Sequence, residues 1–127
     1  MNKGLFEHVN MTVSDPVRTA QMLCDLFDWT IRWQGPALGG GYTVHVGTEA
    51  GYVALYSVDK PQRLEGRSYA HIGAVNHLGI LVDDLDKTEA RILAAGIQTH
   101  SHQEYEPGRR FYFHDHDNVE YEVVSYA

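Results

Sequence analysis

The 127-residue sequence contains a single cysteine, Cys24, so no disulfide can form within the chain. This fits the reducing cytoplasm, where we expect the protein to reside. No apolar run approaches the roughly 20 residues that a membrane-spanning helix requires. The N-terminus has no apolar core of the signal-peptide type. These absences predict a cytoplasmic protein that does not interact with a membrane.

Positive charge is also scarce, because 10 Lys and Arg face 17 Asp and Glu, which gives a formal net charge of −7 at pH 7. Proteins that bind nucleic acid need a basic surface that replaces counterions, so we expect no nucleic-acid partner. An anionic membrane surface is disfavoured for the same reason. The hydrophobic share of 43% and the charged share of 21% are typical of a globular protein with a core of its own.

The most informative feature is a segment that occurs twice, 69 positions apart, at residues 7–16 and 76–85. Each copy has a histidine at the start of a β-type run and an aspartate that can cap a following helix. The matches lie at a strand start, a strand end, a helix cap and a helix face, so we interpret the chain as two copies of one unit. The identical pairs are His8 and His77, Val13 and Val82, Asp15 and Asp84, and Thr19 and Thr88.

Unit one is predicted to cover about residues 5–58. Its helix follows Asp15, a good N-cap, and Pro16, which suits the first helical position. Alternation of apolar and polar residues and the glycine-rich turns indicate the strands. The expected elements are a strand at 6–13, a helix at 16–27, a strand at 29–33, a loop at 35–41, and a hairpin of 42–46 and 52–58.

Unit two is predicted to cover about residues 71–127, after a polar linker at 59–70. Asp83 or Asp84 caps its helix, and Gly96 ends it. The expected elements are a strand at 75–82, a helix at 85–95, a strand at 97–102, a loop at 105–109, and a hairpin of 110–114 and 119–126.

Two helices and eight strands in this order predict an α+β fold and a single domain over residues 1–127. The tandem βαβββ units are expected to form two curved mixed sheets around a concave cleft, with one helix outside each.

Three residues suggest a metal site on the concave face. His8 and His77 both start the first strand of their unit, so the internal symmetry brings them to equivalent places. Glu122 lies on the last strand, where an acid is disfavoured unless it is paired or binds a metal. Two histidines and one carboxylate form a facial triad that suits Fe(II), Mn(II), Ni(II) or Zn(II) and leaves positions open. Glu120 lies on the same face of the strand and is the alternative candidate for the carboxylate ligand.

The chain resembles the vicinal-oxygen-chelate superfamily, which includes glyoxalase I, fosfomycin-resistance enzymes, bleomycin-resistance proteins, methylmalonyl-CoA epimerase and extradiol dioxygenases. The resemblance covers nearly the whole chain and is carried by residues 8–15, 76–84 and 111–122. The last segment is similar to the family ending F-Y-x-x-D-P-D-G-x-x-x-E, with His116 for proline and Asn118 for glycine. Asparagine tolerates the left-handed turn conformation, so Asn118 in place of glycine is a mild change.

The resemblance implies that His8, His77 and Glu122 bind one divalent metal ion, Fe, Mn, Ni or Zn. Some branches carry a fourth ligand on the last strand of unit one, and there the sequence has Leu55, which cannot bind a metal. Glyoxalase I chemistry is therefore disfavoured. Extradiol dioxygenases and fosfomycin-resistance enzymes remain, although no arginine follows the last strand to bind phosphonate as it does in the latter.

The resemblance also assigns two catalytic candidates. Tyr112 lies ten residues before Glu122, where both branches place a tyrosine that approaches the substrate. His102 lies near the position of a histidine in the extradiol signature. Tyrosine and histidine at these places can donate hydrogen bonds or move a proton. Three other histidines, His45, His71 and His100, are expected at the surface, and His114 and His116 in the last turn.

The implied function is that of a metal-dependent dioxygenase or lyase that chelates two neighbouring oxygens of a small molecule. The alternative is a metal-free protein of the bleomycin-resistance type, which binds a drug or metabolite with aromatic side chains. Eight tyrosines and two tryptophans are available for this. The family also implies a homodimer, with either swapped or unswapped units.

Overall fold

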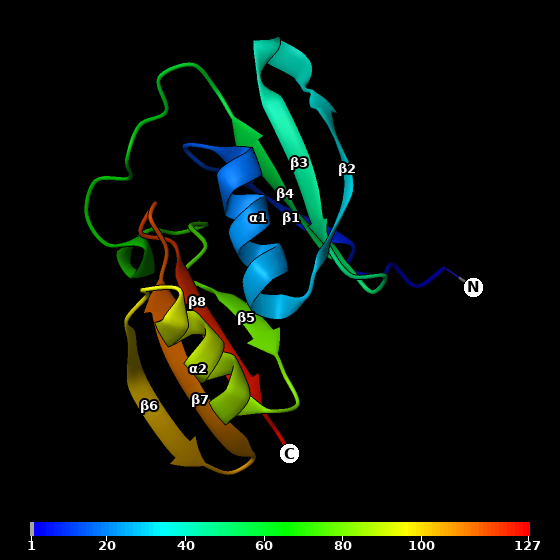
Figure 1. Cartoon of the computed structure of the whole chain (residues 1–127). Helices are drawn as coiled ribbons and strands as arrows, with labels where there is room; N and C mark the ends of the chain where they lie inside the picture. The colour runs from blue at the N-terminus through cyan, green and yellow to red at the C-terminus, as the bar shows by residue number, and fades with distance from the viewer. Residues whose placement is uncertain (1) are drawn as a thin grey trace. The chain divides into compact units, whose positions relative to one another are not determined.

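The computed structural model describes residues 2–127 and divides them into two compact units, with the boundary between Gln62 and Arg63 (Figure 1). Each unit has the order β-α-β-β-β, so the predicted repeat and the α+β class are confirmed. The shared cleft and the single domain concern the arrangement of the two units and stay predictions. Within residues 2–127, no helix is long and apolar enough to cross a membrane.

Unit 1 is a four-stranded mixed sheet with one helix. Its strands lie in the order β1-β4-β3-β2, and β1 runs parallel to β4 while the other neighbours are antiparallel. Its elements are β1 (His8–Thr12), α1 (Pro16–Phe27), β2 (Thr30–Pro36), the short helix η1 (Leu38–Gly40), β3 (Tyr42–Gly47) and β4 (Tyr52–Ser57).

Unit 2 repeats this topology, with the strand order β5-β8-β7-β6 and a parallel pair of β5 and β8. Its elements are η2 (Ser68–Ala70), β5 (Leu78–Leu81), α2 (Leu85–Ala94), β6 (Thr99–Tyr105), β7 (Gly108–His114) and β8 (Glu120–Ser125). The helix η2 lies in the segment that was predicted to be an irregular linker.

Both long helices begin at the predicted aspartates. The Asp15 carboxylate accepts a hydrogen bond from the Arg18 amide at 3.2 Å, and the Asp84 carboxylate accepts one from the Lys87 amide at 3.0 Å. The structure thereby selects Asp84 over Asp83 as the second cap. After α2 the chain turns at Gly96 with a positive φ of 84°, as expected for a glycine that ends a helix.

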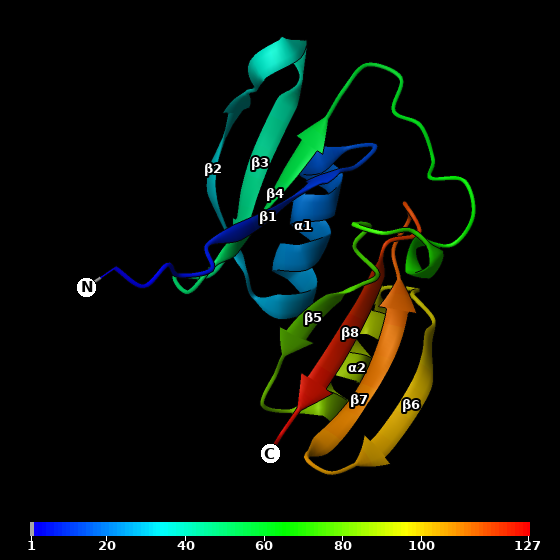
Figure 2. The same ribbon diagram turned by 180° about the vertical axis from the view of Figure 1, so that it is seen from behind.

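Each sheet has a helix-covered face and an open face. In unit 2, side chains from β7 and β8 that point toward α2 are fully buried, namely Phe111, Phe113, Tyr121 and Val123. Because successive side chains of a strand point to opposite faces, the residues between them lie on the open face. Figure 2 shows the sheet of unit 2 from this side, with α2 behind it. The open face is polar and carries the candidate site.

Several predicted strand boundaries are wrong. β2 extends to Pro36, which pairs with Tyr42 at the end of an edge strand, where the missing N–H of proline is tolerated. The expected loop at 105–109 is a tight turn at Glu106 and Pro107, so β6 and β7 are longer than predicted. β5 starts at Leu78, so the residue before it, His77, lies just outside the strand.

The choice of cap gives a stability test. We expect Asp84→Ala to lower the free energy of unfolding by about 1 kcal/mol, because the Lys87 amide loses its acceptor. Asp83→Ala changes the neighbouring exposed carboxylate and should stay within about 0.5 kcal/mol of the unmodified protein. Urea unfolding followed by circular dichroism measures both, and equal losses would contradict the assignment.

Candidate metal-binding site

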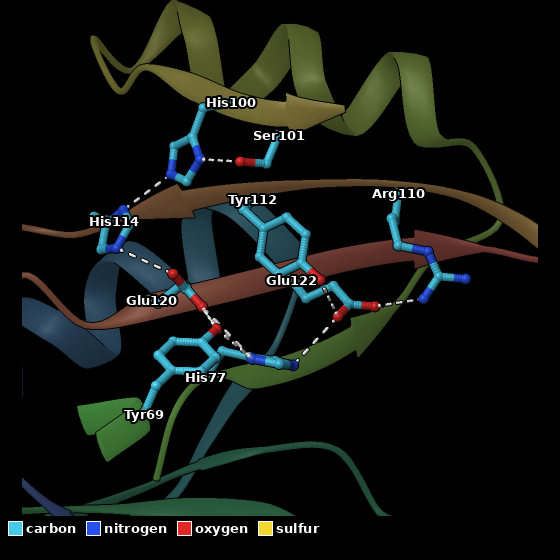
Figure 3. Close-up of polar contacts among 9 residues, drawn as sticks. All are labelled: Tyr69, His77, His100, Ser101, Arg110, Tyr112, His114, Glu120 and Glu122. Atoms are coloured by element: carbon cyan, nitrogen blue, oxygen red, sulfur yellow. Dashed lines mark hydrogen bonds and ion pairs between the residues drawn. The ribbon is translucent and has the colours of Figure 1, made fainter. Parts of the chain in front are cut away.

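His77 lies between two carboxylates of β8 on the open face of unit 2 (Figure 3). Its Nδ1 is 3.5 Å from Oε2 of Glu120, and its Nε2 is 3.2 Å from Oε1 of Glu122. The two glutamates share this face because the residue between them, Tyr121, is buried on the helix side. Glu120 and Glu122, the two candidates for the carboxylate ligand, therefore contact opposite nitrogens of the same imidazole ring.

Glu122 is further held by two residues of β7. Tyr112 is its direct partner across the strands, and the Tyr112 hydroxyl donates to Oε1 at 2.7 Å. The Arg110 guanidinium donates to Oε2 at 3.0 Å. Since the Glu122 side chain is only 13% exposed, these charge-assisted bonds replace the water that the carboxylate loses. The structure thus brings His77, Glu122 and Tyr112 together.

Tyr112 is a hydrogen-bond donor over a wide pH range. Burial raises its pKa to about 12, and the hydrogen bond to Glu122 and the charge of that carboxylate contribute further. The phenol proton is therefore retained at neutral pH, where it points at Glu122 Oε1.

Glu120 belongs to a second chain of polar contacts. The Tyr69 hydroxyl from η2 donates to Glu120 Oε2, and the same hydroxyl lies 3.3 Å from Nδ1 of His77. On the other side, Oε1 of Glu120 is 3.4 Å from Nε2 of His114, whose Nδ1 is 2.9 Å from Nε2 of His100. His100 and His114 are half-buried and share the open face, contrary to the expectation of a surface residue and a turn residue.

Sequence reasoning missed four residues of this cluster, namely Tyr69, His100, Arg110 and His114. Arg110 and His114 follow from the alternation already applied to β8, because they lie two positions on either side of Tyr112. No sequence pattern indicated a site role for Tyr69, because it lies in a polar segment without periodicity. It reaches the site only through the fold of unit 2.

His102 is not brought to Tyr112 and Glu122. Its Nε2 is 2.6 Å from Oε2 of Glu89 on α2, so it lies on the helix side of the sheet. The cause is a bulge between His100 and Gln103, which interrupts the alternation along β6. His100 therefore faces the open side, where its ring stacks on Tyr112 at 6.3 Å and 20°.

In unit 1, His8 starts β1 as predicted and also has a carboxylate on Nδ1. Oε1 of Glu7 is 2.8 Å from this nitrogen, and the Tyr52 hydroxyl donates to the same oxygen at 3.3 Å. The His8 ring stacks on Tyr52 at 4.9 Å, and His45, which is half-buried, stacks on the same tyrosine at 4.6 Å. Whether His8 meets His77 at one metal ion stays a prediction.

The strand registers correct the position assigned to Leu55. Asn10 pairs with Ala54 in unit 1, and its counterpart in the repeat, Gly79, pairs with Glu122 in unit 2. The equivalent of Glu122 is therefore Ala54, while Leu55 is buried on the other side of the strand. Alanine cannot bind a metal either, so β4 offers no ligand at this place.

The distances in unit 2 fit two ligands of one ion. Ligand atoms about 2.1 Å from a metal lie about 3.0–3.4 Å apart for octahedral to tetrahedral angles. The 3.2 Å between His77 Nε2 and Glu122 Oε1 falls in this range. Among the residues 2–127, no group of three or more His, Cys, Asp or Glu is arranged to hold a metal ion.

The comparisons with known proteins agree with this fold. Residues 5–123 match the model of the Glyoxalase/Bleomycin resistance protein/Dioxygenase superfamily. No curated protein sequence matches the chain.

Three solved structures illustrate the likeness. A domain of the glyoxylase/bleomycin resistance protein/dioxygenase type from Frankia sp. EAN1pec has a TM-score of 0.79 and 22% identity, over 98% of this chain and 93% of that one. The fosfomycin resistance protein FosX from Listeria monocytogenes, complexed with Mn(II) and sulfate, has a TM-score of 0.73 and 22% identity over 98% and 93%. FosX from Mesorhizobium loti has a TM-score of 0.70 and 26% identity over 97% and 91%.

The environment of Tyr112 predicts an unusual titration. In the protein treated with chelator, Tyr112 should remain protonated at pH 10, where an ordinary tyrosine is half ionised, and titrate near pH 12. Because the folded-state pKa is raised, the stability contribution is complete below about pH 10 and lost between about 10 and 12. NMR of ¹³Cζ-labelled tyrosine measures the midpoint.

Glu122→Gln should lower this pKa, since it removes the charge that opposes phenolate formation. Glu104→Gln, an exposed acid of the same unit, is the matched control and should leave the midpoint unchanged. A Tyr112 midpoint near 10 in the unmodified protein would contradict the described environment.

Proposed function

The chain belongs to the Glyoxalase/Bleomycin resistance protein/Dioxygenase superfamily, and on this premise we propose that it is a metal-dependent enzyme. His8, His77 and Glu122 hold one divalent ion in this proposal, and the substrate is a small molecule with two neighbouring oxygens. The observation that carries it is the 3.2 Å separation of His77 Nε2 and Glu122 Oε1 beside a protonated Tyr112.

The metal supplies a Lewis acid that polarises the two oxygens of the substrate when both are bound. The protein's own groups have distinct roles. Arg110 engages Oε2 of Glu122, so the carboxylate presents Oε1 alone to an ion. Tyr112 retains its proton and can donate a hydrogen bond to a substrate oxygen on the open face.

Two reaction types are compatible with this arrangement, an extradiol-type dioxygenation and a lyase-type addition or elimination. Since His102 faces α2, the imidazole that we assign to the substrate side is His100, which stacks on Tyr112. Mn(II) is the ion of first choice among Fe, Mn, Ni and Zn, because histidine and carboxylate ligands suit it and a structurally similar FosX was crystallised with it. A cytoplasmic homodimer is part of the proposal and rests on the family resemblance and the single cysteine.

A second candidate function has an observation of its own in unit 1. Trp33, His45, Tyr52 and His8 form a continuous series of ring contacts at 5.3, 4.6 and 4.9 Å. Trp33, at the end of this series, is 52% exposed. Such a row can bind a planar ligand by stacking without a metal, as a drug-binding member of the bleomycin-resistance type would.

The enzyme proposal is tested by titration with Mn(II) in a calorimeter. We expect one ion per chain in the unmodified protein. His77→Ala and Glu122→Ala should weaken binding by more than the 10–100-fold that loss of an outer partner costs, since each removes a ligand. The control is His71→Ala, because His71 is an exposed histidine of the same unit with a backbone partner only. Absence of Mn(II) binding, or an unchanged affinity in His77→Ala, would overturn the proposal.

The binding-protein alternative predicts metal-independent binding of an aromatic ligand. In chelator-treated protein, bleomycin should quench tryptophan fluorescence, and Trp33→Ala should weaken the binding about 5-fold, the equivalent of about 1 kcal/mol of ring contact. Tyr126→Ala removes an exposed aromatic ring elsewhere and serves as the control. Binding that requires Mn(II), or an affinity that Trp33→Ala leaves unchanged, counts against this alternative. The affinity itself is measured by isothermal titration calorimetry.

A further inference from the structure

Arg110 is a cation whose hydrogen-bonding capacity is only partly used. Its side chain is 14% exposed and lies on the open face of unit 2, where Nη1 donates to Oε2 of Glu122 at 3.0 Å (Figure 3). Its Nε is buried and has no hydrogen-bond partner among residues 2–127. A buried donor without an acceptor costs free energy, so an acceptor that reaches this N–H would stabilise the site.

The unused donors of Arg110 lie along one edge of the guanidinium. In arginine, the N–H of Nε and one N–H of Nη2 point in the same direction and match the two oxygens of a carboxylate. Within residues 2–127, no hydrogen bond or ion pair involves Nη2 of Arg110. Nη2 is also not one of the buried side-chain atoms without a partner, so it reaches solvent. An anion that approaches through Nη2 therefore meets both donors.

The neighbours of Arg110 on β6 leave this edge without an acceptor. The ring of Tyr105 lies over the guanidinium, with the central carbon Cζ 4.9 Å from the ring centroid, so the tyrosine covers a face and not an edge. Gln103 is the cross-strand partner of Arg110 and is exposed. Gln103 and Tyr105 are two positions apart and share the open face. An aromatic ring and an amide thus lie next to Arg110, and neither carries a negative charge.

The preceding residue, Arg109, shows the contrast with a fully paired guanidinium of the same strand. It points to the helix side, where Nη1 and Nη2 donate to the two oxygens of Asp86 at 3.2 and 3.3 Å. Its side chain is 43% exposed, so Arg110 is both the more buried of the two arginines and the one with fewer partners. Proteins break such local rules mainly at functional sites.

The charges of the open face favour an anion when a divalent ion is bound. The strands of unit 2 place three charged side chains on this face, Arg110, Glu120 and Glu122, with a sum of −1. With a divalent ion held by His77 and Glu122, as proposed above, the sum becomes +1. A singly charged carboxylate neutralises this sum, whereas a phosphate group carries about −1.5 to −2 at pH 7.

We propose that Arg110 binds a carboxylate group of the substrate through Nε and Nη2. The substrate is then a small carboxylic acid whose two neighbouring oxygens are separate from the carboxylate. The inference rests on the proposed function for those two oxygens, whereas the binding of a carboxylate to Arg110 can be measured without a substrate. Arg110 determines specificity in this proposal, because a neutral analogue would leave its buried Nε–H without an acceptor.

The carboxylate site is tested with acetate as the probe. The Nε–H signals of ¹⁵N-arginine-labelled protein are recorded in the presence of Zn(II), a d¹⁰ ion that does not broaden them, and Arg110→Lys identifies the Arg110 signal by its loss. We expect acetate to shift this signal and to leave that of Arg109 unchanged, because Asp86 already accepts from the Arg109 guanidinium. A chelator should weaken the response, since the sum of charges on the face returns to −1.

Two results of this titration would contradict the proposal. An Arg110 signal that acetate does not shift, with or without Zn(II), overturns the site. A tighter response to inorganic phosphate than to acetate overturns the assignment of a carboxylate.

A pair of ligands that differ in charge tests the specificity. Protocatechuate, a benzoate with two neighbouring hydroxyl groups, and its uncharged amide are titrated into Zn(II)-loaded protein in a calorimeter. We expect the acid to bind about 10–100-fold more tightly than the amide, which is the size of a charge-assisted hydrogen bond. The preference should persist in Arg109→Gln and disappear in Arg110→Gln. No preference in the unmodified protein, or one that survives in Arg110→Gln, would overturn the proposal.

The ratio of the two affinities separates substrate recognition from metal binding. Arg110→Gln also removes a partner of Glu122, but a change in metal affinity alters the binding of the acid and the amide alike. Arg110→Lys keeps a positive charge without the planar fork. It should therefore restore Zn(II) affinity relative to Arg110→Gln while recovering only part of the preference for the acid.

The two proposals fail in different ways. If metal binds but acetate leaves the Arg110 signal unshifted, the enzyme proposal stands and the carboxylate site is wrong. If neither Mn(II) nor Zn(II) binds, the enzyme proposal is wrong, and the acetate titration of the chelator-treated protein still decides whether Arg110 binds a carboxylate.

Discussion

The site in unit 2 depends on the partners of one desolvated carboxylate, that of Glu122. An acid in the middle of a strand and largely out of water is costly unless its charge is compensated. Arg110, Tyr112 and His77 provide this compensation from β7 and from the residue before β5. An apolar residue in place of any of them would leave part of this buried charge uncompensated. The same partners that allow the carboxylate to be buried also orient it toward the imidazole.

The register of β7 and β8 places these partners, and a buried tyrosine helps to hold it. Tyr121 stacks on Phe113 at 4.7 Å, and its hydroxyl donates to Asp115 at 2.8 Å. Burial raises the pKa of Tyr121 strongly, so the phenol stays a donor. Asp115 also accepts from the amides of Asp117 and Val119, which closes the turn between the two strands. A slip of one residue would turn Glu122 toward α2 and its hydrophobic core.

The two units share one backbone topology, but the side chains on their open sheet faces differ. Cross-strand partners Tyr112 and Glu122 in unit 2 correspond to His45 and Ala54 in unit 1. The open face of unit 2 is therefore rich in charge, whereas that of unit 1 is a row of stacked rings. The feature common to both is a histidine at the first strand of the unit, since His8 starts β1 and His77 directly precedes β5. This supports a shared role for the two histidines despite the divergence around them.

The sequence by itself determined the βαβββ repeat and the two helices that follow an aspartate cap. These follow from short-range rules, namely helical and strand periodicity, capping, and alternation along a strand. Only the tertiary structure decided the place of Tyr69 and His102. Tyr69 comes from a segment without periodicity, and His102 was moved to the helix side by a bulge in β6 that leaves no clear mark in the residues. Contacts between distant segments and breaks in alternation depend on how the strands pair, which local patterns do not encode.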